Sequence, residues 1–157
     1  MSSRFVRPET VRLEISNGDW LLVKKHLTAG EVRRQWTSTM KAGGDGGAKV
    51  DPLKVGLSKM VAYLVDWSLT DADGKPVPIR GQSEDMVGST LDMLLPDDFS
   101  EVLRAIETHE AAMDAARAEE KKILSGATKS DPILPSPESS DGDTNGSPNL
   151  IATSMAS

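Results

Sequence analysis

The stretch from Val65 to Ile79 constrains the fold most, because an apolar run ends there in a segment that cannot be helical. It reads V-D-W-S-L-T-D-A-D-G-K-P-V-P-I. Asp73-Gly74 is a turn pair, and Pro76 and Pro78 each hold φ near −65° and lack a backbone N–H. We therefore expect the chain to bend and extend here, which separates an N-terminal half from a C-terminal half.

The composition changes at residue 127. Residues 127–157 are rich in Ser, Pro, Gly and Asp and contain no aromatic residue, so they cannot bury enough apolar surface to offset their chain entropy. We predict one small domain over residues 1–126 and a disordered acidic tail over 127–157. The tail carries half of the formal net charge of −6, since Lys129 is accompanied by four carboxylates, Asp131, Glu138, Asp141 and Asp143.

Composition also argues against several function classes. The chain has no cysteine, which excludes disulfides, thiolate metal sites and a cysteine nucleophile, and its two histidines, His26 and His109, are far apart. No basic cluster suggests nucleic acid or an anionic membrane as a partner. No apolar run approaches the roughly 20 residues that span a bilayer, and the N-terminus has no signal core. We expect a soluble intracellular protein without enzymatic activity or a cofactor.

A β-hairpin is predicted over residues 11–24. Val11, Leu13 and Ile15 alternate with polar residues, and Asn17-Gly18 is the pair that a two-residue turn with positive φ prefers. With such a turn Ile15 faces Trp20 and Leu13 faces Leu22. We therefore expect one apolar face, formed by Val11, Leu13, Ile15, Trp20 and Leu22, that packs on helices.

Four helices are expected, at about 29–41, 52–66, 84–94 and 96–125, which makes the fold α+β and mainly helical. Thr28 and Glu31 have capping-box spacing, Asp51-Pro52 suits a helix start, and Ser83 can cap the third helix. The first helix carries the apolar stripe Val32, Trp36 and Met40. Residues 42–48 are glycine-rich and indicate a flexible linker, because a phosphate-binding loop would need a Gly-Lys-Ser/Thr sequence. The run from Val61 to Leu69 also alternates like a strand, although helix to about Asp66 is favoured.

Two acidic groups invite a chemical interpretation but are explained without one. Asp71 and Asp73 lack the third ligand and the distal Glu of a calcium loop, so a solvated turn is expected. Asp97, Asp98 and Glu101 fall in the first turn of a helix, where the helix dipole favours carboxylates. Seven methionines against six aromatic residues favour a surface that adapts to a partner, with core filling as the alternative for each one.

Three segments, taken in order, resemble the tail assembly chaperones of long-tailed bacteriophages, including the short product of the lambda-type gene pair. The first runs from Asp19-Trp20 to Leu27-Thr28-Ala29-Gly30-Glu31. The second is Val65 to Ile79, and the third is the Leu95–His109 helix, L-P-D-D-F-S-E-V-L-R-A-I-E-T-H, which continues into an Ala/Glu/Lys-rich stretch. Together they cover most of residues 10 to 125.

The resemblance implies a protein that binds the long, helical tape-measure protein and keeps it soluble until the tail tube forms. It also implies tail-tube subunits and a longer frameshifted form as further partners. The adaptable apolar faces add a second copy of the chain as an expected partner. The expected location is the host cell cytoplasm, with absence from the mature virion. The alternative is a structural virion component, such as a head–tail or tail-tube accessory protein.

The candidate partner-binding residues are large apolar side chains on the expected helix faces. They could equally form the domain's own core. They are Trp36, Met60, Leu64, Trp67 and Phe99.

Overall fold

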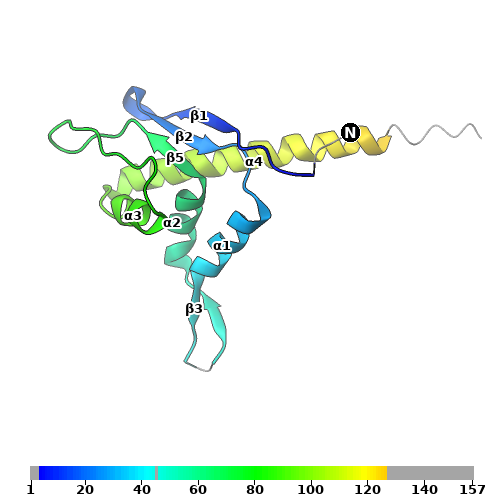
Figure 1. The fold of residues 1–157 in the computed structure, drawn as a ribbon, viewed down its shortest axis with the longest axis horizontal. Coiled ribbons are helices and arrows are strands. Elements are labelled where there is room, and N and C mark those ends of the chain that lie inside the picture. The colour runs from blue at the N-terminus through cyan, green and yellow to red at the C-terminus, as the bar shows by residue number, and fades with distance from the viewer. Residues whose placement is uncertain (1–3, 45, 127–157) are drawn as a thin grey trace, which may run out of the picture.

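The computed structural model describes residues 4–44 and 46–126, and the expectation of a disordered tail lies outside these residues. In this part of the chain four helices accompany a small antiparallel sheet and a separate short hairpin, which confirms an α+β, mainly helical fold (Figure 1). The helices are α1 (Ala29–Thr39), α2 (Pro52–Tyr63), α3 (Glu84–Leu91) and α4 (Pro96–Gly126). The strands are β1 (Thr10–Glu14), β2 (Trp20–Lys24), β3 (Met40–Ala42), β4 (Ala48–Val50) and β5 (Leu64–Trp67).

The β1–β2 hairpin forms, but its expected register is wrong by one residue. Asn17 and Gly18 do take positive φ, of 60° and 80°. However, Ile15 N–H donates to the Asp19 carbonyl and Asp19 N–H to the Ser16 carbonyl, so the loop has three residues, Ser16 to Gly18, instead of the expected two. Leu13 therefore pairs with Leu21.

This one-residue slip reverses the faces of β2, because side chains alternate along a strand. Leu21 and Val23 are fully buried, whereas Trp20 and Leu22 are only partly buried. Trp20 lies on the outer face, with the Arg12 guanidinium 4.8 Å from its ring centroid. The sequence W-L-L-V is apolar on both faces, so alternation alone could not choose between the two registers.

The helix expected to reach Asp66 ends earlier, and its last residues form a strand. α2 stops at Tyr63, and β5 follows directly and pairs antiparallel with β2, giving the strand order β1-β2-β5. The helix expected over 52–66 is therefore confirmed to Tyr63, and the expectation was wrong only for Leu64 to Asp66, where the alternating pattern marks a strand. A short apolar run cannot distinguish helix from strand by periodicity alone.

The glycine-rich segment expected to be a linker is instead the tip of a second hairpin. β3 and β4 pair in the register Met40 with Val50 and Ala42 with Ala48, and Gly43 N–H donates to the Gly47 carbonyl. The first helix therefore ends at Thr39 rather than near residue 41. Figure 1 shows this hairpin projecting away from the sheet.

Helix starts follow the expected caps. The Thr28 hydroxyl accepts from Glu31 N–H while the Glu31 carboxylate accepts from Thr28 N–H, which completes the capping box. Asp51 accepts from Leu53 N–H, and Ser83 accepts from Met86 N–H. The third helix ends at Leu91, three residues before its expected end, whereas α4 runs to Gly126 as one helix.

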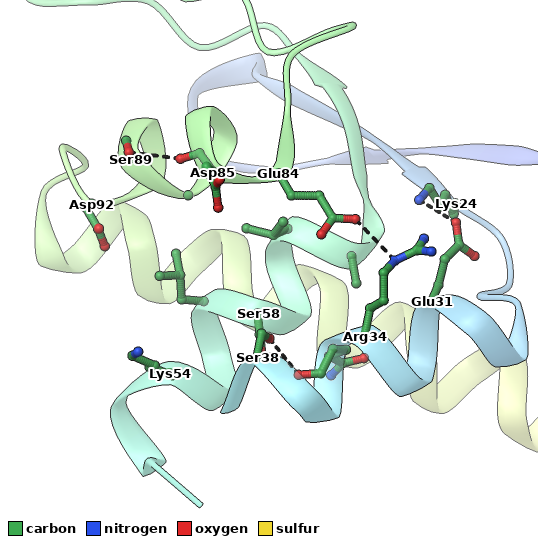
Figure 2. Close-up of a pocket in the computed structure, with 15 residues that line it drawn as sticks. Lys24, Glu31, Arg34, Ser38, Lys54, Ser58, Glu84, Asp85, Ser89 and Asp92 are labelled. Atoms are coloured by element: carbon green, nitrogen blue, oxygen red, sulfur yellow. Dashed lines mark hydrogen bonds and ion pairs between the residues drawn. The ribbon is translucent and has the colours of Figure 1, made fainter. Parts of the chain in front are cut away.

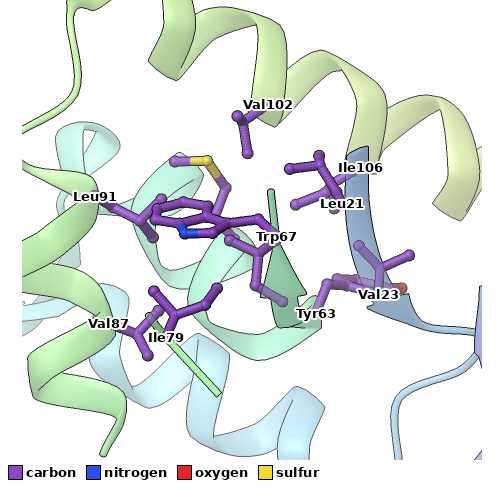
Figure 3. Packing of buried hydrophobic residues seen from close by; sticks show 11 residues of the cluster. Leu21, Val23, Tyr63, Trp67, Ile79, Val87, Leu91, Val102 and Ile106 are labelled. Atoms are coloured by element: carbon purple, nitrogen blue, oxygen red, sulfur yellow. The ribbon is translucent and has the colours of Figure 1, made fainter. Parts of the chain in front are cut away.

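The core lies where α2, α3 and α4 meet one face of the sheet. α2 is central and contacts α1, α3 and α4. Figure 3 shows the Trp67 indole among side chains of the other elements, with Leu91 and Val102 nearby. The buried apolar cluster comprises Leu21, Val23, Met60, Tyr63, Leu64, Trp67, Ile79, Val87, Leu91, Val102 and Ile106.

The segment after β5 is a hydrogen-bonded bend. The Asp71 carboxylate accepts from the backbone N–H groups of Asp73 and Lys75, both at 2.9 Å. Beyond the bend the chain returns to the core, where Trp67 Nε1 donates to the Val77 carbonyl at 2.6 Å. The acidic turn thus has a structural role in reversing the chain.

Candidate partner-binding surface

The apolar stripe of α1 faces solvent. Its members Val32, Trp36 and Met40 are 38%, 53% and 45% exposed, although they recur at the spacing that usually marks a buried helix face. Val32 and Trp36 lie in α1, and Met40 is its C-cap residue and the first residue of β3. We call these three residues the α1 stripe. Large apolar side chains aligned on one exposed helix face are typical of a surface that a partner covers.

The stripe is exposed because α1 packs on the domain through its neighbouring polar face. Glu31 and Gln35 are partly buried and Thr39 is fully buried, with its hydroxyl donating to the Trp36 carbonyl at 2.7 Å. Each of these residues precedes a stripe residue by one position, which turns it about 100° around the helix axis. Burying the polar face therefore directs the apolar one sideways into solvent.

The β3–β4 hairpin extends the stripe. Met40 and Val50 are paired across the two strands, so their side chains emerge on the same side of the hairpin. Val50 is 47% exposed. The apolar surface thus continues from α1 onto the hairpin.

At its other end the stripe meets a hollow, which we call the basic groove. This hollow of about 1050 Å³ lies between the N-terminal segment, the β2–α1 junction and the distal part of α4. Val32 lines it together with other apolar groups, including Leu27 and Leu124. Around these groups stand six Lys or Arg side chains and two Glu side chains, namely Arg4, Arg7, Lys25, Arg33, Arg117, Lys121, Glu9 and Glu120.

His26 lines the basic groove, and its pKa reflects the positive charge there. Partial burial lowers the pKa of His26, and the positive charges of Arg117 and Lys25 lower it further. Arg117 lies 3.4 Å from His26 Nδ1. The neutral imidazole is therefore the form that this cationic groove favours.

A second hollow, of about 380 Å³, lies between α1, α2 and α3 (Figure 2). Its charged groups are of both signs and several pair with one another. Lys24 lies 2.8 Å from Glu31, and Arg34 reaches toward Glu84 at 3.6 Å. This internal neutralisation makes it a weaker candidate for a partner than the α1 stripe.

The junction that positions α1 depends on Glu31. Partial burial alone would raise the pKa of this carboxyl group, but hydrogen bonds from Lys24 and from the backbone and hydroxyl of Thr28 outweigh it. The pKa of Glu31 is lowered to about 2 from an ordinary value of 4.5. Glu31 therefore ties β2, the helix cap and α1 together only while it is ionised.

We expect Glu31→Gln to reduce the free energy of unfolding at pH 7 by about 1–2 kcal/mol, a value discounted for the partial exposure of Lys24. Because the folded pKa is depressed, the ionised Glu31 stabilises above about pH 4.5, and this contribution is lost as pH falls toward 2. Urea unfolding of both proteins at pH 7, 4.5 and 3 measures this. The two curves should converge with falling pH, and a constant difference would refute the assignment.

Glu14→Gln serves as the control for that measurement. Glu14 pairs with Arg12 at 2.8 Å, but its side chain is 63% exposed. Exposed ion pairs contribute little, so unfolding should change by less than about 0.5 kcal/mol at any of these pH values.

The structure separates the five candidate partner-binding residues. Trp36 is exposed and stands at the centre of the α1 stripe. Met60, Leu64 and Trp67 are buried in the core, so a partner cannot reach them in this fold, and their assignment to the binding surface is corrected. Phe99 is partly buried and packs against the same core. Met60, Leu64, Trp67 and Phe99 therefore belong to the domain's own packing, which was the alternative.

Three surface residues were not among those candidates. Val32 and Met40 share the stripe with Trp36, and their helical spacing could have identified them. Val50 could not have been found, because its place beside Met40 depends on the second hairpin. Of the methionines, Met40, Met86 and Met93 are exposed and Met60 is fully buried.

The ionisable side chains that could take part in chemistry contact other parts of the fold. Glu101 accepts from Ser16 N–H and Ser16 Oγ, both at 2.8 Å, which fastens the first hairpin to α4. His109 is buried, with Nε2 3.1 Å from the Lys24 carbonyl and its ring edge-on to Tyr63. Burial raises the pKa of Tyr63, and the neighbouring Glu110 carboxylate raises it further. These contacts account for each group as part of the fold.

Within residues 4–44 and 46–126, no three His, Asp or Glu side chains are grouped so as to hold a metal ion. Over the same ranges no helix is both long and apolar enough to cross a membrane. No protein-family model, curated protein or solved structure matches this chain.

Proposed function

We propose that this chain is a non-enzymatic assembly chaperone of the phage tail class, which binds the tape-measure protein and keeps it soluble for tail-tube assembly. The proposal joins two independent supports. One is the sequence resemblance carried by residues 10 to 125. The other is the α1 stripe, an aligned apolar row along α1 and its C-cap that the domain itself leaves exposed.

The α1 stripe suits a helical client. An amphipathic helix of the client can lay its apolar face along Val32, Trp36 and Met40, which removes apolar surface of both partners from water. Trp36 is the natural centre of such a contact, because a large aromatic side chain contributes most to interfaces of this kind. The exposed methionine at position 40 can adapt to different client side chains.

The proposal is tested by co-expressing the full chain with the client that it names, a tape-measure protein. We expect the soluble fraction of that client to rise several-fold and the two proteins to co-purify. A client that is equally insoluble with and without the chain would contradict the proposal. Expression of an unrelated coiled-coil protein beside the chain controls for a general effect on solubility.

Mass spectrometry of purified particles separates this proposal from the structural alternative. A chaperone that acts in the host cytoplasm should be missing from finished virions. A stoichiometric amount of the chain in the particle would instead indicate a head–tail or tail-tube component.

A further inference from the structure

The basic groove presents cations that the described fold leaves unneutralised. Among residues 4–44 and 46–126, no carboxylate lies within ion-pair distance of Arg33, Arg117 or Lys121. Lys25 differs from these three cations, because it pairs with Glu9 at 2.8 Å. The groove therefore combines free positive charge with an apolar floor around Leu27 and Val32, which suits an acidic chain segment with apolar residues.

We propose that this groove is the docking site of the chain's own acidic segment 131–143. The segment reads D-P-I-L-P-S-P-E-S-S-D-G-D and contains four carboxylates and no basic residue. Its Ile133-Leu134 pair offers apolar side chains of the kind that the groove floor accepts. The negative charge of the segment thus complements the positive charge of the groove.

The chain length also fits. α4 ends at Gly126, and its groove residues Arg117 and Lys121 lie within about 14 Å of that end, at 1.5 Å per helical residue. Residues 127–131, when extended, span about 16 Å. The chain can therefore turn back after the helix and place Asp131 beside Arg117, with Ile133 and Leu134 following into the groove.

Docking would couple the tail to the α1 stripe, because Val32 belongs to both surfaces. If the proposed function holds, the tail covers one end of the client surface and a client helix must displace it there. The docking itself does not depend on the identity of the client, and it is tested on the isolated chain.

Paramagnetic relaxation enhancement in the full-length protein tests the docking. The chain has no cysteine, so Ser136→Cys provides a single position for a spin label. We expect broadening of backbone amides at 25–33 on the β2–α1 side of the groove as well as at 117–124 on α4. Broadening limited to the last turns of α4 would show only the covalent tether and would overturn the proposal.

The control keeps the tether and removes the charge, through Asp131→Asn, Glu138→Gln, Asp141→Asn and Asp143→Asn in the labelled chain. At surface ion-pair strength each of the four changes weakens docking about twofold, so together they should lower the docking equilibrium constant about 16-fold. Unchanged broadening at 25–33 would contradict the proposal. Mixing labelled chains with isotope-labelled, spin-free chains should give no broadening, and broadening there would assign the groove to the tail of a second copy instead.

Discussion

Trp67→Ala should lower the free energy of unfolding by about 3–5 kcal/mol, the largest single-residue effect that we expect in this domain. Trp67 is only 6% exposed and lies in β5, where it packs into the cluster that joins the sheet to the helices (Figure 3). The substitution leaves a cavity and removes the hydrogen bond that the Val77 carbonyl accepts from Trp67 Nε1. The free energy of unfolding of a domain of this size is about 5–15 kcal/mol, so this loss is a large share of it.

Urea unfolding followed by circular dichroism measures this loss, with Trp36→Ala as the matched control. Both changes remove an indole, but Trp36 is 53% exposed and should alter unfolding by less than about 0.5 kcal/mol. If Trp36→Ala destabilised the domain as much as Trp67→Ala, the assignment of one tryptophan to the core and the other to the surface would be wrong.

Trp36→Ala should greatly weaken binding to a client helix, although it leaves the fold stable. Truncating a central aromatic residue of an interface costs about 2 kcal/mol or more, so affinity for a client helix should fall by roughly thirtyfold. Titration calorimetry of the full chain with a soluble helical segment of the client measures the change. Because folding is unaffected, circular dichroism spectra of the variant and the parent should coincide.

Met93→Ala is the control for the binding measurement. Met93 is 85% exposed in the connection between α3 and α4 and lines neither the basic groove nor the hollow between α1, α2 and α3. Its truncation should leave affinity within about twofold of the parent, as surface substitutions outside an interface do. An equal loss from both variants would show that apolar exposure in general, rather than the α1 stripe, holds the client.

Local signals in the sequence predicted local structure well. The side chains of Thr28, Asp51 and Ser83 each cap the helix that they precede, because capping depends on residues only two or three positions away. Asn17-Gly18 likewise forms the expected bend with positive φ. These features needed no information from the rest of the fold.

Features set by tertiary contacts could not be predicted in the same way. The hairpin register depends on which face of β2 meets α2 and α4, and both faces of Trp20-Leu21-Leu22-Val23 are apolar. Leu64 to Trp67 became a strand because β2 offered an open edge. Spacing alone identified the α1 stripe, but only the packing of Thr39 and Gln35 showed that the stripe faces outward.

Site-specific photo-cross-linking shows which surface of the chain the client contacts. A benzophenone amino acid replaces Trp36 in one chain and Met93 in another, and each chain is co-expressed with the long coiled-coil client and irradiated. We expect an adduct between chain and client from position 36 and little or none from position 93. No adduct from position 36, or equal adducts from both positions, would contradict the claim that the α1 stripe is the surface that covers the client.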